Sequence, residues 1–103
     1  MVKGVLREEL EHSLGAVDAY NDAISKLPRG SLVRKSIRNK EYYYLAYRLN
    51  SKKVVLSYIG RLSEEQVTAY RENIDRRRRY QQLLRELKQK ISYLRKALNV
   101  KVR

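Results

Sequence analysis

Several residue types that define common functional sites are missing from this chain. It contains no cysteine, so neither disulfide bonds nor thiolate metal sites are available. Its only histidine, His12, has no convergent partners for a metal site or a general base, and we expect it to be a solvated surface residue. The four glycines are scattered, so no glycine-rich phosphate loop is present. We therefore expect no enzyme activity, no catalytic residue, no metal and no cofactor.

Long apolar runs are also missing. None approaches the roughly 18 residues that span a bilayer. Near the N-terminus, Arg7, Glu8, Glu9 and Glu11 interrupt any signal-peptide core. No helical segment combines a fully basic face with a bulky apolar one, as membrane-surface helices do. These patterns predict a cytoplasmic protein without a membrane partner.

Acidic residues are scarce. The chain of 103 residues holds 24 Lys and Arg against 11 Asp and Glu, a net charge of +13. Residues 1–28 carry three cations and five acids, a net −2, so the remaining residues carry 21 cations and six acids, a net +15. Such an excess favours nucleic acid as a partner. The acidic N-terminal segment is expected to pair with part of the C-terminal segment.

Residues 31–60 are the only part that predicts β-structure. Three runs rich in Val, Ile, Leu and Tyr are separated by the pairs Asn39-Lys40 and Asn50-Ser51, which suit two-residue hairpin turns. Those turns predict a three-stranded antiparallel meander with Arg34 opposite Leu45 and Leu45 opposite Leu56. One face would then be mostly apolar and need a helix to cover it; it carries Leu32, Tyr43, Leu45, Tyr47, Val54, Leu56 and Tyr58.

The other face of this meander mixes cations and tyrosines. It would carry Lys35, Tyr42, Tyr44, Arg48 and Lys53. A face of this composition is suited to contact an anion. The alternative is that a helix or a second subunit covers it.

The first helix is predicted over residues 5–27, within an N-terminal segment 1–28. Pro28 and Gly30 end it. Gly15 in its interior predicts a close helix–helix contact. Its apolar positions follow a heptad spacing: Leu6, Leu10, Ser13, Val17, Tyr20, Ile24 and Leu27.

The second helix is predicted over residues 63–98, beginning with a Ser63–Gln66 capping box. Its apolar seam has two parts, Val67 to Ile74 and Tyr80 to Leu98, separated by the run Arg76–Arg79. We expect the first part to cover the sheet. The second part would form a coiled coil with the N-terminal helix or with another copy of the chain. A break near Arg76, giving two helices, is the alternative. The whole sequence thus predicts a single α+β domain.

These elements favour a nucleic-acid-binding protein, with duplex DNA preferred to RNA. Strands of a sheet can lie in the DNA major groove, and with RNA the same tyrosines could stack on unpaired bases. The predicted base-facing residues are Lys35, Tyr42, Tyr44, Arg48 and Lys53. The predicted phosphate contacts are Arg38, Lys40, Lys52, Arg61, Arg76, Arg77, Arg78 and Arg79.

A second hypothesis keeps the same fold but changes the partner. The protein would be a structural or interaction protein, such as an antitoxin-like protein or an assembly factor. Its heptad helices would bind an acidic protein. For the nucleic-acid-binding protein, the heptad seams favour a homodimer through the helices.

The segment 27–62 reads LPRGSLVRKSIRNKEYYYLAYRLNSKKVVLSYIGRL. It resembles short basic proteins of bacteria, archaea and their mobile elements that carry L-P-x-G-S-L, then Y-Y-Y-L-x-Y-R, then Y-I-G-[KR]. It is more loosely similar to the N-terminal hairpin segment of some DDE-type transposases. The resemblance implies a DNA-associated setting, nucleoid-associated or encoded by a mobile element or virus. The catalytic carboxylates of those transposases have no counterpart here, so only a binding role is implied.

Overall fold

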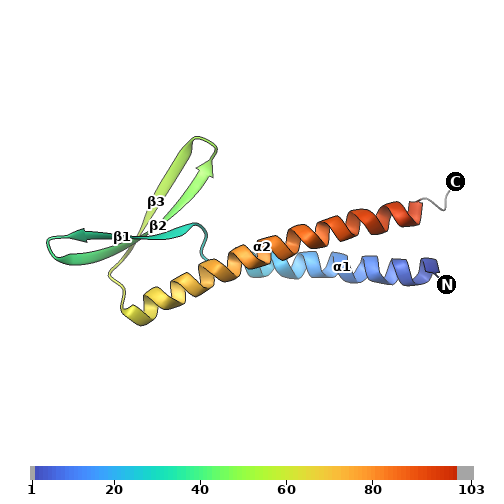
Figure 1. The fold of residues 1–103 in the computed structure, drawn as a ribbon, viewed down its shortest axis with the longest axis horizontal. Coiled ribbons are helices and arrows are strands. Elements are labelled where there is room, and N and C mark those ends of the chain that lie inside the picture. The colour runs from blue at the N-terminus through green and yellow to red at the C-terminus, as the bar shows by residue number, and fades with distance from the viewer. Residues whose placement is uncertain (1, 100–103) are drawn as a thin grey trace. The chain divides into compact units, whose positions relative to one another are not determined.

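The computed structural model describes residues 2–99 and confirms the α+β fold (Figure 1). Its elements, in chain order, are α1 (Val2–Ser25), β1 (Ser31–Ile37), β2 (Lys40–Asn50), β3 (Lys53–Gly60) and α2 (Glu64–Asn99). The strands form one antiparallel sheet in the order β1-β2-β3, which is the predicted meander. The chain divides into two compact units. One contains α1 with α2 from Arg79 onward, and the other contains residues 27–78.

The first unit is an antiparallel helical hairpin (Figure 1). Glu9, early in α1, forms an ion pair with Lys90, late in α2. Tyr20, late in α1, meets Tyr80 edge to face with ring centroids 5.6 Å apart. The second apolar seam of α2 therefore packs against α1, as one of the two predicted arrangements requires. The most buried side chains of this unit are Ser13, Leu84, Ile91 and Leu94.

Helix α2 begins at the predicted capping box. The Gln66 backbone N–H donates to Ser63 Oγ at 3.1 Å, and the Ser63 N–H donates to Gln66 Oε1 at 2.9 Å. Glu64 and Glu65 lie in the first turn, where the helix dipole favours acids. The helix then continues without interruption through Arg76–Arg79 to Asn99, so the alternative of two separate helices is excluded.

The β1–β2 hairpin differs from the prediction by a shift of its turn. The turn residues are Arg38 and Asn39, with φ of 52° and 66°, rather than Asn39 and Lys40. This is the two-residue turn in which both positions are left-handed, and its twist matches that of the strands. Leu45 consequently lies opposite Leu32 instead of Arg34. The shift amounts to two residues, so the predicted faces of β1 and β2 are retained.

The β2–β3 hairpin also differs from the prediction, and here each side chain of β3 lies on the face opposite to the predicted one. Ser51 and Lys52 form its turn, and Leu49 is an extra residue, which forms a β-bulge between Arg48 and Asn50. Leu45 therefore lies opposite Ser57, whereas Leu56 lies opposite Ala46. The prediction that Val54, Leu56 and Tyr58 share the face of Tyr43 is wrong, because a bulge changes the pairing by one residue and exchanges the two faces.

Within the second unit, one face of the sheet is covered by the first part of α2. Tyr43 is 6% exposed and Ile74 of α2 is 4% exposed. Leu32 of β1 and Ile74 line a common cavity. Within this unit α2 therefore packs on the face that carries Leu32 and Tyr43, as the first part of its seam predicted.

Two glycines differ in whether the fold leaves room for a side chain. Gly30, just before β1, has φ of 91°, and a Cβ there would lie 2.1 Å from the Ala46 carbonyl oxygen. Gly15 lies inside α1, and a Cβ there would meet nothing within 4 Å. The prediction of a close helix contact at Gly15 is therefore wrong, because that position faces open space.

We expect Gly15→Ala to raise the free energy of unfolding by about 1 kcal/mol, since alanine has the higher helix propensity. Gly30→Ala should lower it by at least about 2 kcal/mol, because the left-handed backbone and the carbonyl both oppose a side chain. Urea denaturation followed by far-ultraviolet circular dichroism measures both. Equal effects of the two substitutions would contradict this account.

The Glu9–Lys90 contact gives the helical hairpin a pH dependence. The hydrogen bond and the charge of Lys90 lower the pKa of Glu9 below its ordinary value of 4.5. Because the folded-state pKa is the lower one, the contact stabilises the fold above about pH 4.5. Its contribution is lost as the pH falls through the lowered folded-state value.

We expect Glu9→Gln to flatten the decrease in unfolding free energy between neutral and acidic pH, as measured by denaturation at a series of pH values. Glu8→Gln removes the same charge from a neighbouring exposed position and serves as the control. Parallel pH profiles for the parent protein and Glu9→Gln would show that the contact does not contribute in solution.

Candidate nucleic-acid interface

The face of the sheet opposite Tyr43 is open and carries no acidic side chain. Register and strand alternation place on it residues from all three strands: Val33, Lys35, Ile37, Lys40, Tyr42, Tyr44, Ala46, Arg48, Val54, Leu56 and Tyr58. We call these residues the open face. Several of its apolar side chains are exposed, among them Tyr58 at 60% and Val54 at 58%. An exposed surface of this kind is a candidate interaction site.

Three tyrosines form a cluster on the open face. The ring of Tyr58 lies 5.3 Å from that of Tyr44, at an interplanar angle of 60°, and 6.4 Å from that of Tyr42, at 39°. Lys35 Nζ lies 5.2 Å from the centroid of the Tyr44 ring, within the range of a cation–π contact. We call Lys35, Tyr42, Tyr44 and Tyr58 the tyrosine cluster. It combines aromatic surface and positive charge.

The structure brings together four of the five predicted base-facing residues, namely Lys35, Tyr42, Tyr44 and Arg48. Lys53 is not among them, because alternation along β3 places it on the face opposite to Val54. Tyr58 takes its place in the cluster, although sequence reasoning assigned Tyr58 to the covered face. No local pattern distinguishes the two arrangements, since the difference depends on the single extra residue Leu49.

Both turns of the meander present cations. Arg38 lies in the β1–β2 turn and Lys40 begins β2, and both are exposed. At the other end of β2, the Lys52 backbone N–H donates to Asn50 Oδ1 at 2.9 Å, and the residue is exposed. Arg61, just after β3, is also exposed. These four side chains can therefore reach an anion without disturbing the fold.

Arg29 takes part in the structure although the sequence did not single it out. Its Nη2 donates to the carbonyl oxygen of Arg48 at 2.8 Å, and its guanidinium lies 4.3 Å from the centroid of the Tyr47 ring. Arg29 therefore links the chain before β1 to the far end of β2. The contact joins residues 19 positions apart, so no short motif could have revealed it.

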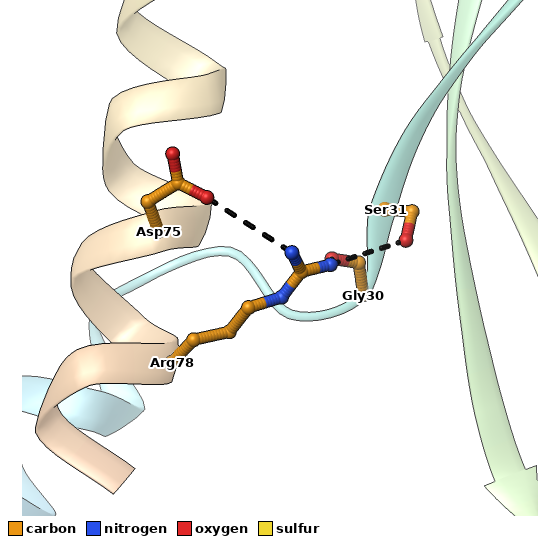
Figure 2. A network of polar contacts seen from close by, with 4 residues as sticks. All are labelled: Gly30, Ser31, Asp75 and Arg78. Atoms are coloured by element: carbon orange, nitrogen blue, oxygen red, sulfur yellow. Dashed lines mark hydrogen bonds and ion pairs between the residues drawn. The ribbon is translucent and has the colours of Figure 1, made fainter. Parts of the chain in front are cut away.

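The arginines of α2 differ from one another in their surroundings. Arg78 Nη2 lies 3.3 Å from both the Gly30 carbonyl oxygen and Ser31 Oγ, and its Nη1 lies 3.9 Å from Asp75 (Figure 2). Arg78 thus fastens α2 to the start of β1. Arg77 is half-buried, and burial, followed by the charge of Arg29, lowers its pKa.

The other two arginines of the run are more accessible. Arg76 is exposed and donates to Asn73 Oδ1 at 3.1 Å, one helical turn away. Arg79 is also exposed. As phosphate contacts, Arg76 and Arg79 would therefore require less rearrangement of the fold than Arg77 and Arg78.

Within residues 2–99, no group of three or more His, Cys, Asp or Glu side chains could hold a metal ion. Over the same residues, no helix has the length and apolar character needed to cross a membrane. Three comparisons with known proteins found no matching family model, no matching curated protein and no matching solved structure.

We expect Arg78→Gln to lower the free energy of unfolding by about 1 kcal/mol, because it removes the hydrogen bonds to Gly30 and Ser31 while the site stays solvated. Arg79→Gln, one residue further along α2, should stay within about 0.5 kcal/mol of the parent protein. Chemical denaturation checks both variants. If Arg79→Gln were the more damaging substitution, the fastening role of Arg78 would be wrong.

Proposed function

We propose that this protein binds nucleic acid, with DNA preferred to RNA, and catalyses no reaction on it. The observation that supports this most directly is the open face, where tyrosines and cations lie together without any acid. The net charge of +13 supplies the long-range attraction to a polyanion. In this proposal the strands face the bases, while the cations of the turns contact phosphates.

Duplex DNA is the ligand that the sequence favoured, with the sheet lying in the major groove. Phosphate contacts then come from Arg38, Lys40, Lys52 and Arg61, and from the exposed Arg76 and Arg79 of α2. The similarity of segment 27–62 to proteins of mobile elements is consistent with this role. It also supports the proposal of a cytoplasmic location, near the nucleoid or in a mobile-element or viral setting.

A homodimer through the helices remains part of the proposal. The apolar seams of α1 and α2 contact each other within one chain, so a second copy would have to use other helical surfaces. Leu14 is 37% exposed and Val5 is 66% exposed, and each offers apolar surface outside those seams. The oligomeric state is measurable by sedimentation.

A second candidate function, binding of an acidic protein, is favoured by a groove of about 380 Å³ on the helical hairpin. Its lining includes three apolar residues, Leu14, Val17 and Ile91, and three cations, Lys88, Arg95 and Lys96. An amphipathic segment with acidic residues would match both the apolar and the cationic part of this lining. The absorbance at 260 nm of the purified protein discriminates simply between the two functions, since a nucleic-acid-binding protein retains its ligand at low salt.

We expect the affinity for a labelled duplex oligonucleotide, followed by fluorescence anisotropy, to fall steeply as salt increases, because each neutralised phosphate releases counterions. Replacing Arg38, Lys40 and Lys52 together by Gln should reduce the slope of log K against log salt by about 3, roughly one for each lost phosphate contact. Nearly constant affinity between low and moderate salt would contradict nucleic-acid binding.

The matched control for this experiment removes the same charge elsewhere. Lys3, Arg7 and Lys26 are the cations of the N-terminal segment, and all three are exposed. Their joint replacement by Gln should leave the slope close to that of the parent protein. Equal losses in the two triple variants would show that net charge alone, and not the turns of the meander, determines binding.

A further inference from the structure

The open face is less suited to hydrogen-bonded reading of a duplex than the sequence suggested. Direct readout in the major groove relies on donors and acceptors that reach base edges. Of the cations on this face, Lys35 lies near the β1–β2 turn and Arg48 near the β2–β3 turn, and Arg48 Nη1 already donates to the Ser51 carbonyl oxygen at 3.2 Å. Lys53 lies on the other face. Tyr58, Leu56 and Val54 stand where polar side chains would be required.

The open face has few hydrogen-bond donors, but it has exposed aromatic surface. Tyr58 touches both Tyr42 and Tyr44 and yet remains 60% exposed, so much of its ring remains accessible. Every nucleobase has a flat π-surface, and aromatic side chains on a sheet take up unpaired bases by stacking, with little dependence on sequence. A duplex cannot offer those surfaces, because its bases are already stacked on one another.

The charges around the cluster fit the backbone that such bases carry. Lys35 lies against Tyr44, so an ammonium group is available within a few ångströms of a stacked base. Lys40 lies at the same end of the sheet, paired with Ile37. A single strand crossing the face would therefore place phosphates near cations while its bases meet tyrosine rings.

From this geometry we propose that the tyrosine cluster is a stacking platform for unpaired bases, so that the preferred ligand is a single-stranded stretch of nucleic acid. This inference rests on the proposed function and specifies the form of the ligand. Tyr44 and Tyr58 are the principal stacking residues, and Lys35 contacts the adjoining phosphate. The polymer is recognised by its exposed bases, with no requirement for a particular sequence.

The test distinguishes stacking on an aromatic ring from contact with an apolar side chain that has no ring. Two variants of the full chain are made, Tyr44→Phe with Tyr58→Phe and Tyr44→Leu with Tyr58→Leu, and circular dichroism confirms that each is folded. Their affinities for a fluorescein-labelled oligothymidine of about 15 nucleotides, and for a duplex of about the same length, are measured by anisotropy at one salt concentration. The control is Tyr93→Leu, at an exposed tyrosine on α2 in the other unit.

We expect the parent protein to bind the single strand more tightly than the duplex. The Phe variant should bind it within about threefold of the parent, and the Leu variant roughly tenfold more weakly for each ring removed. Tyr93→Leu should bind like the parent. The chain has no tryptophan, so its tyrosine emission can be followed directly, and we expect the oligothymidine to quench it less in the Leu variant.

Three results would overturn the inference, and they separate it from the proposed function. Tighter binding of the duplex, with equal affinities for the Phe and Leu variants, would reject stacking while leaving nucleic-acid binding intact. Absence of binding to either oligonucleotide at low salt would reject both. The third result is a parent protein that sediments as a dimer and binds no nucleic acid, together with a Leu variant that sediments as a monomer. It would show that the open face contacts a second copy of the chain.

Discussion

The β-bulge at Leu49 determines which side chains this protein presents on its sheet. Without it, the Ser51-Lys52 turn would place Leu56 opposite Tyr47 on the covered face, and Lys53 would lie on the face of Tyr42 and Tyr44. With it, β3 is exchanged between the two faces, and Val54, Leu56 and Tyr58 become accessible while Tyr43 remains buried. The bulge adjoins a turn, Ser51-Lys52, in which neither residue has positive φ. Such turns match the twist of a hairpin poorly, and an added residue restores the fit between the strands.

Helix α2 is one continuous helix that contributes residues to both compact units. Its first apolar stripe ends at Ile74 and its second begins at Tyr80, and the arginines lie between them. Two of these arginines, Arg77 and Arg78, are engaged with the chain around Gly30 or partly buried there. Part of the basic run therefore holds the fold together. Charge counts alone would have assigned the whole run to a ligand.

The tyrosines, like the arginines of α2, fall into two groups: some stabilise the fold and others lie on the exposed surface. Tyr43 is buried, Tyr47 lies against the guanidinium of Arg29, and Tyr20 packs against Tyr80 in the helical hairpin. Tyr42, Tyr44 and Tyr58 instead gather on the open face, next to Lys35. Tyrosine suits both roles because its ring contributes apolar area while its hydroxyl tolerates water. The proposed stacking platform thus uses three of the nine tyrosines, and its position depends on strand pairing.

Local sequence was sufficient for much of this architecture. The heptad spacing of α1, the capping box at Ser63 and the absence of a breaker in α2 each depend on residues within a few positions of one another. For that reason the helices, the meander and the break between the two apolar stripes could be predicted. The residues that complete the open face could not. The bulge at Leu49, the exchange of Lys53 for Tyr58 and the bond from Arg29 to Arg48 depend on pairing between strands and on contacts far apart in the chain. Only the folded backbone decides those, because a shift of a single residue in pairing leaves the local pattern unchanged and reverses the face to which every following side chain points.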